Sequence, residues 1–150
     1  MLTMPLAELA TRIRMGALTG IYHAQSGHPG GSLSVADILA VLYGREMRID
    51  PLRPDWEDRD RFVLSKGHCA PALYAALAEC GFISHDELPT LRHIDSRLQG
   101  HPDMKKVPGV DMSTGSLGQG ISAACGMALS GKLRKKDYRV YTVIGDGESE

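Results

Sequence analysis

Two short apolar runs, each followed by a polar turn that contains glycine, constrain the fold of this chain most. Residues 62–64 (Phe-Val-Leu) precede Ser-Lys-Gly-His, and residues 140–144 precede Gly-Asp-Gly. Apolar runs of this length favour buried strands, and segments with helical spacing separate them. The alternation predicts an α/β domain with a mainly parallel sheet and flanking helices. Ligands of such sheets bind at the carboxyl ends of the strands, where both polar turns lie.

The helices are predicted from apolar spacing and from residues that favour helix ends. Residues 6–24 carry apolar side chains three and four positions apart, as in a helix with one buried face. Ser34 followed by Asp37 resembles a capping box that opens a second helix, which Gly44 is placed to end. Further helices are expected over residues 69–80, 86–94 and 121–133. Residues 96–120 are rich in Gly, Pro and Asp, and a loop of that length favours a functional role.

Composition limits the classes of function. A chain of 150 residues with 43% hydrophobic residues matches one domain with a real core. The formal net charge of -1 favours neither a nucleic-acid surface nor an anionic-membrane surface, so an acidic ligand needs a local site. Three cysteines without a CxxC pair predict reduced core residues in a cytoplasmic protein, namely Cys69, Cys80 and Cys125. We expect no secretory signal and no membrane helix, and the amino-terminal arginines fit an amphipathic helix better than a transit peptide.

Five segments place a histidine, an acid or a serine among glycines. Four of them are SGHPGG (26–31), SKGH (65–68), QGHP (99–102) and IGDG (144–147), and the fifth is GSLGQG (115–120). Glycine lets backbone amides approach a ligand closely, so such loops suit an anion or a cofactor. GSLGQG leads into a predicted helix, but it lacks the GK[ST] ending of a P-loop and follows no convincing strand. Both nucleotide-binding interpretations therefore fail.

Asp146 follows an apolar strand directly, where a carboxylate has no role in packing. It can be a common Asp-Gly turn, or it can be a ligand for a divalent ion. Mg²⁺ takes one or two carboxylates together with phosphate oxygens, which would let a nearly neutral chain bind a diphosphate. A zinc site made from His28, His68 and His101 is the competing metal hypothesis, and the wide spacing of these residues disfavours it.

The order of the five segments resembles the cofactor-diphosphate domain of the transketolase family. SGHPGG, RDRFVLSKGH, QGHPD, TGSLGQGISAACGMA and IGDGESE occur in that family's order, and the resemblance covers residues 6–150. The likeness is greatest to compact transketolases and to the amino-terminal subunits of split ones. It implies a thiamine-diphosphate-binding fold for residues 1–150, as a single, partial domain that is incomplete at its carboxyl end.

The resemblance also implies roles for particular residues. Asp146 would coordinate Mg²⁺, and the backbone of Gly147 and the side chain of His68 would contact the diphosphate of thiamine diphosphate. The thiazolium and aminopyrimidine region would be lined by Gly115, Ser116 and Leu117.

Two further histidines are implied to act on the substrate. His28 and His101 would face the reacting carbon, hydrogen-bond the first hydroxyls of a ketose and assist proton movement. The other histidines match no motif and are expected to be surface or structural residues: His23, His85 and His93.

The implied activity is transfer of a two-carbon ketol unit from a ketose phosphate to an aldose phosphate, as in the pentose phosphate pathway. A second metal-binding residue, an asparagine, and an activating glutamate are expected outside these 150 residues. The glutamate belongs to a pyrimidine-binding domain or a carboxy-terminal subunit, within a homodimer or a heterotetramer. The 150 residues alone should therefore be inactive.

Two alternatives remain open. Another thiamine-diphosphate transferase, such as a deoxyxylulose-phosphate synthase, fits the same cofactor, although RDRFVLSKGH and QGHP favour transketolase. A noncatalytic assembly or binding subunit of the same fold is the other, and the presence of His28, His68, His101 and Asp146 argues against it.

Overall fold

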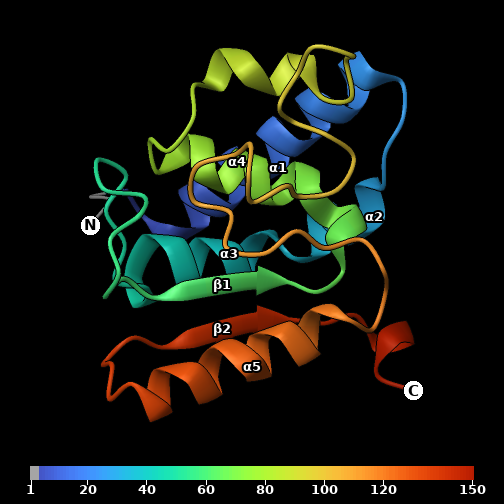
Figure 1. The fold of residues 1–150 in the computed structure, drawn as a ribbon. Helices are drawn as coiled ribbons and strands as arrows, with labels where there is room; N and C mark the ends of the chain where they lie inside the picture. The colour runs from blue at the N-terminus through green and yellow to red at the C-terminus, as the bar shows by residue number, and fades with distance from the viewer. Residues whose placement is uncertain (1–3) are drawn as a thin grey trace.

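Two parallel strands, β1 (Arg61–Leu64) and β2 (Val140–Val143), form the sheet in the described part of the chain (Figure 1). The computed structural model describes residues 4–150, so the first three residues of the amino-terminal stretch lie outside it. The strands pair from Arg61 opposite Val140 to Leu64 opposite Val143. The prediction of an α/β fold with parallel pairing is confirmed. Figure 1 shows several helices on one side of the strands, namely α1 (Leu6–Ala24), α3 (Ala36–Val41) and α4 (Ala70–Glu79). A single helix, α5 (Gly120–Leu133), lies on the other side.

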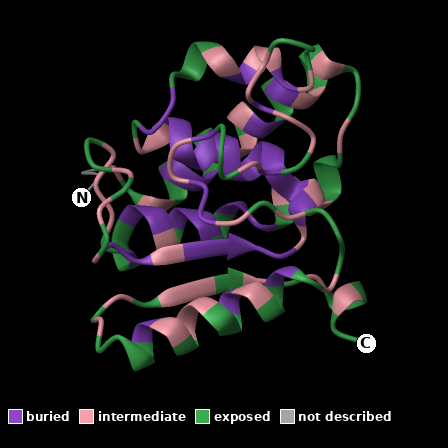
Figure 2. Ribbon diagram, in the orientation of Figure 1, coloured by how far each residue is buried: buried purple, intermediate pink, exposed green. Residues whose placement is uncertain are grey.

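The core lies between β1 and the first group of helices. Helix α4 is buried on every side, because its first nine residues, Ala70 to Ala78, are almost inaccessible to solvent. Helix α1 approaches it closely at Gly16, where a Cβ atom would lie 2.9 Å from the Cβ of Ala75. Figure 2 shows that buried residues concentrate in α4 and β1, whereas β2 and α5 are mostly intermediate or exposed.

The predicted second helix differs from the observed one at both ends. A short helix, α2 (Pro29–Ser34), already begins after His28, because proline at the first helical position has a backbone angle suited to a helix. Ser34 therefore ends α2 instead of capping a helix, and its hydroxyl donates to the carbonyl of Gly31 at 3.2 Å. Gly44 lies inside a π-helical turn (Leu42–Glu46), so the prediction that it ends the helix was also wrong.

The other helical predictions were partly confirmed. Helices α1, α4 and α5 occupy the predicted segments, but residues 86–94 form only a 3₁₀ turn (His85–Thr90). A capping box at Ser84 opens this turn, and Pro89 lies inside it. No helix of residues 4–150 is both long enough and apolar enough to cross a bilayer. Residues 96–119 contain no helix or strand, as expected for the long loop.

The three cysteines are free thiols in different environments. Cys69 is buried, Cys80 is partly buried and Cys125 is exposed on α5. The prediction that all three lie in the core was wrong for Cys125, because α5 buries only Gly120, Ala124 and Gly131 and leaves Cys125 exposed.

The long loop is attached to β1 through a buried carboxylate. Asp111 accepts a hydrogen bond from the Nη2 of Arg59 at 2.6 Å and another from the backbone N–H of Phe62 at 2.7 Å. Arg59 and Asp111 are each only 8% exposed, so neither charge is well solvated. A charge buried in this way is tolerated only when its partner remains in place.

We expect Asp111→Ala to lower the free energy of unfolding by about 3–5 kcal/mol, because it leaves the Arg59 guanidinium buried without its partner. Urea denaturation followed by circular dichroism measures the change. Glu8→Gln, which removes one charge of an exposed pair with Arg12, is the control and should cost less than about 1 kcal/mol. Equal losses in the two variants would contradict the role assigned to Asp111.

Candidate functional site

Parallel pairing places the turns that follow β1 and β2 at the same edge of the sheet. The ladder continues one residue beyond β1, where the N–H of Ser65 donates to the carbonyl of Val143 at 3.0 Å. Residues 66–68 then leave β1, and residues 145–147 leave β2. Helix α5 begins at the same place, because the N–H of Ile121 donates to the Ser65 hydroxyl at 3.2 Å. Three of the five glycine-containing segments therefore meet at this edge.

Two of the predicted histidines lie against each other with the edge of one ring toward the other. His28 precedes α2 and is exposed, whereas His68 lies half-buried in a 3₁₀ turn (Gly67–Cys69). Their ring centroids lie 5.1 Å apart with an interplanar angle of 62°. The segments SGHPGG and SKGH are thus brought together.

His101 approaches the GSLGQG segment. Gly115 has a φ of +150°, and a Cβ atom there would lie 3.0 Å from the Cγ of His101. The backbone carbonyl of His101 accepts a hydrogen bond from the Tyr74 hydroxyl at 3.0 Å, which ties this loop to α4. The exposed imidazole is therefore carried on an anchored backbone.

Basic groups surround His68 and change its titration. Burial lowers the pKa of His68, and the nearby charges of His28, Lys66 and His101 lower it further, while Glu148 acts in the opposite direction. Its imidazole is therefore neutral near pH 7. Three basic side chains thus gather around His68 in a chain whose formal net charge is only -1.

The segment Gly115–Leu117 lies against the end of β1. A Cβ atom on Gly67 would lie 2.7 Å from the Oγ1 of Thr114, so only glycine allows this approach. The Thr114 hydroxyl donates to the carbonyl of Leu64 at 2.7 Å and holds the loop there. Gly115, Ser116 and Leu117 are all exposed. A cavity of about 290 Å³ opens between the loop and α5, lined by Met112, Ser113, Thr114, Gly115, Ser116, Gln119 and Gly120.

Asp146 and Gly147 are exposed in a 3₁₀ turn (Asp146–Glu148) after β2. Within residues 4–150 the Asp146 carboxylate takes part in no hydrogen bond or ion pair, so it is free for a ligand. The described residues contain no group of three or more His, Cys, Asp or Glu side chains that could hold a metal ion. The zinc hypothesis for the three histidines therefore receives no support, whereas a single carboxylate remains compatible with Mg²⁺.

Sequence reasoning missed several residues that organise this edge. The Nζ of Lys66 donates to the carbonyl of Gly31 at 3.3 Å, which joins SKGH to SGHPGG. Arg92, with a left-handed φ of +63°, donates from Nη1 to the Ser26 hydroxyl at 2.5 Å. Its Nε lies 2.9 Å from where a Cβ of Gly100 would be, so Arg92 joins the loops that carry His28 and His101. Lys66 lies inside a recognised motif, but no sequence signal points to Arg92.

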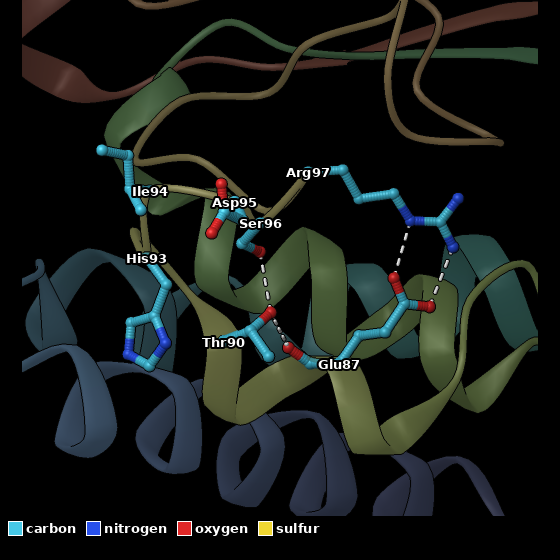
Figure 3. A pocket seen from close by; sticks show the side chains of 7 residues that line it. All are labelled: Glu87, Thr90, His93, Ile94, Asp95, Ser96 and Arg97. Carbon is cyan, nitrogen blue, oxygen red and sulfur yellow. Dashed lines mark hydrogen bonds and ion pairs between the residues drawn. The ribbon is translucent and has the colours of Figure 1, made fainter.

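A separate hollow of the described surface lies elsewhere. Figure 3 shows its lining, with the Glu87–Arg97 ion pair at 2.6 Å and the Thr90–Ser96 hydrogen bond at 2.7 Å. Its volume is about 860 Å³, and no residue of the five segments lines it. The histidines without a motif are exposed, as expected: His23, His85 and His93.

Comparison with known proteins identifies the family. Residues 6–147 match the family described as transketolase, thiamine diphosphate binding domain. The chain is 51% identical over 145 residues to the 6-deoxy-6-sulfo-D-fructose transketolase subunit SqwG of Clostridium sp. (strain MSTE9), covering 97% of this chain and 53% of that protein. It is 51% identical over 144 residues to the transketolase of Mus musculus, covering 95% of this chain and 23% of that protein.

The fold agrees with this relationship. The structure of transketolase from Leishmania mexicana superposes with a TM-score of 0.91 at 36% identity, covering 97% of this chain and 23% of that one. The chain thus spans about half the length of the bacterial subunit and about a quarter of the longer proteins. From the family match, the sequence identity and the shared fold, this chain belongs to the family of transketolase thiamine diphosphate-binding domains.

Proposed function

We propose that this chain binds thiamine diphosphate and Mg²⁺ and, once completed by a pyrimidine-binding domain or subunit, transfers a two-carbon ketol unit from a ketose phosphate to an aldose phosphate. The observation that carries the proposal is the approach of His28 and His101 to His68 after β1, at the edge of the sheet where the exposed Asp146 turn leaves β2. Family membership makes thiamine diphosphate the expected cofactor. The proposed cellular location is the cytoplasm.

The residues present fit the charged end of this cofactor. A diphosphate needs cations and N–H donors, which Lys66, His68 and the backbone of Gly147 provide. A Cβ atom at Gly147 would meet no atom within 4 Å, so the backbone there is open to a ligand. The unpaired carboxylate of Asp146 provides one hard oxygen ligand for Mg²⁺, and phosphate oxygens supply others.

The cavity beside Gly115 fits the remainder of the cofactor. Ser116 and the exposed backbone of Gly115 line it and offer polar contacts. Leu117 does not line the cavity, but it follows Ser116 in the same loop, is 52% exposed and offers an apolar contact there. Leu117 is a large apolar side chain left in contact with solvent at the edge of the site. Such a residue gains contacts when an aromatic ligand covers it.

Thiamine diphosphate, when bound, supplies the carbon nucleophile of the reaction. The chain's own histidines act on the sugar: His28 and His101 hydrogen-bond the hydroxyls next to the ketose carbonyl and orient it. An imidazole can act as a general acid or base, so the same side chains accept and return a proton at these oxygens. His68, neutral and half-buried beside Lys66, contacts the diphosphate.

Completion by further protein is part of the proposal. One relative is named a transketolase subunit, and this chain spans 53% of it. We infer that the missing asparagine ligand and activating glutamate lie outside the 150 residues, the glutamate on a pyrimidine-binding domain or carboxy-terminal subunit. The assembly would be a homodimer or a heterotetramer with sugar phosphates as substrates.

The proposed function is tested in the complete assembly with Mg²⁺ and thiamine diphosphate. The measurement is ketol transfer from xylulose 5-phosphate to ribose 5-phosphate, followed through a coupled assay of the triose phosphate product. Turnover that requires both the cofactor and the metal is the expected result. A folded, complete assembly that binds the cofactor but transfers no ketol unit from any ketose phosphate would refute the proposal.

We expect Asp146→Asn to weaken thiamine diphosphate binding in the presence of Mg²⁺ by about 100-fold, because a neutral amide is a poorer ligand for a hard cation. Isothermal titration calorimetry of the assembly measures the dissociation constant. Asp137→Asn, an exposed aspartate shortly before β2, is the matched control and should leave it unchanged. Retention of Mg²⁺-dependent binding in Asp146→Asn would show that the metal is held elsewhere.

Substitution of the two exposed histidines should affect turnover rather than cofactor binding. We expect His28→Asn and His101→Asn each to lower kcat/KM for the ketose by about 10²–10⁴-fold, the range for loss of a general acid–base group. The dissociation constant of thiamine diphosphate should change little. His93→Asn, on the separate hollow, is the control; wild-type turnover in either His28→Asn or His101→Asn would remove that residue from the mechanism.

The groups around His68 predict that its pKa is lower than that of a free histidine. In the cofactor-free protein the pKa of His68 should lie below 6.5, its ordinary value in the unfolded chain. On acidification the unfolded chain therefore takes up this proton first, so the free energy of unfolding falls as the pH falls. His28→Asn should raise the pKa of His68 by removing a basic neighbour, while burial still keeps it below 6.5. Histidine NMR titration measures both values, with His93→Asn as the control. An unchanged pKa in His28→Asn would contradict the electrostatic coupling.

A further inference from the structure

A side-chain contact ties the carboxyl ends of the two strands together. Ser65, directly after β1, and Glu148, in the turn after β2, are 83 positions apart, and the Ser65 hydroxyl donates to the Oε1 of Glu148. Ser65 is completely buried and Glu148 is partly buried. The backbone ladder between the strands ends at Ser65, so this contact continues the connection where backbone pairing stops.

The Ser65 hydroxyl also holds the start of α5. It accepts the N–H of Ile121 at 3.2 Å, one of the helix-terminal donors that has no partner within a helix. A Cβ atom on Gly120 would lie 2.6 Å from the Cα of Ser65, so the first residue of α5 rests directly on this backbone. One hydroxyl therefore joins β1, α5 and the turn after β2.

Glu148 closes the turn that presents Asp146. Its Oε2 accepts the N–H of Gly145 at 2.9 Å while its Oε1 accepts from Ser65. Both of its carboxylate oxygens are thus engaged within the protein, whereas the Asp146 carboxylate makes no such contact in residues 4–150. The two acids of the turn therefore differ in role, because one is free for a ligand and the other is used internally.

We propose that Ser65 and Glu148 act as a pair of positioning residues that hold the three cofactor-binding segments in one arrangement before the cofactor binds. The segments are the turn of His68, the loop of Ser116 that leads into α5, and the turn of Asp146. The proposal rests on the proposed function for the identity of the ligand, but the contact itself is a property of the cofactor-free protein. Holding ligand groups in place lowers the ordering cost of binding.

The test compares Glu148→Gln, Ser65→Ala and the double variant in the complete assembly. We expect each single variant to weaken Mg²⁺–thiamine diphosphate binding by about 10-fold, the lower range for loss of a supporting contact. The double variant should weaken cofactor binding by clearly less than the product of the two single fold-changes, because both substitutions remove the same contact. At saturating cofactor, kcat should remain within about two-fold of wild type, since neither residue touches the reacting atoms.

A second measurement is independent of the cofactor. Amide hydrogen exchange of Gly145 and Ile121 should be faster in both single variants than in the wild-type protein without cofactor. The Gly145 N–H donates to Glu148 and the Ile121 N–H donates to Ser65, so loss of either residue removes one acceptor and loosens the surroundings of the other amide. Glu57→Gln, which alters an exposed glutamate beside Lys136, is the matched control for charge and should change neither exchange nor binding. Should Ser65→Ala fail to fold, Glu148→Gln in its surface turn still decides the question.

Three results would overturn the proposal. Multiplying effects in the double variant would show that the two residues act separately, and a fall in kcat with unchanged cofactor affinity would place Glu148 in the chemistry. Unchanged exchange at both amides in Glu148→Gln and Ser65→Ala would show that the contact positions nothing. If the wild-type assembly bound no thiamine diphosphate, the proposed function would fail, while faster exchange in the variants would still establish the tether itself.

Discussion

Parallel pairing of β1 with β2 is the constraint on which the rest of the structure depends. The strands are four residues long and lie far apart in sequence, so polar side chains reinforce the few ladder bonds. At the amino ends, the Asp60 carboxylate accepts the N–H of Arg48 at 2.8 Å and that of Arg139 at 2.7 Å. At the carboxyl ends, Ser65 meets Glu148. Both strands are thereby aligned, which brings their following turns to one edge.

The long loop between α4 and α5 is ordered by the same strand. Asp111 pairs with Arg59 and with the Phe62 amide, and Thr114 bonds the carbonyl of Leu64, so the loop follows β1 from its first to its last residues. A loop of this length needs such attachments because its conformational entropy opposes order. They deliver the Gly115 segment to the exposed face where His101 lies.

Much of the candidate site could be predicted from glycine, histidine and acid patterns, because those residue types carry their chemistry locally. The fold brings SGHPGG to SKGH and QGHP to GSLGQG, so four of the motifs found in the sequence meet in two pairs. The contacts of Arg92 with Ser26 and of Ser65 with Glu148 could not be predicted, because they join segments that only folding brings together.

The sequence by itself determined the α/β class, the helices α1, α4 and α5, and membership of a thiamine diphosphate-binding family, because apolar periodicity and short motifs are local properties. Tertiary structure alone decided which cysteine is exposed and which acid of the Asp146–Glu148 turn is free. Each of these depends on neighbours distant in sequence or on the geometry of a turn. Packing and hydrogen bonding select among conformations that local propensity leaves almost equal in energy.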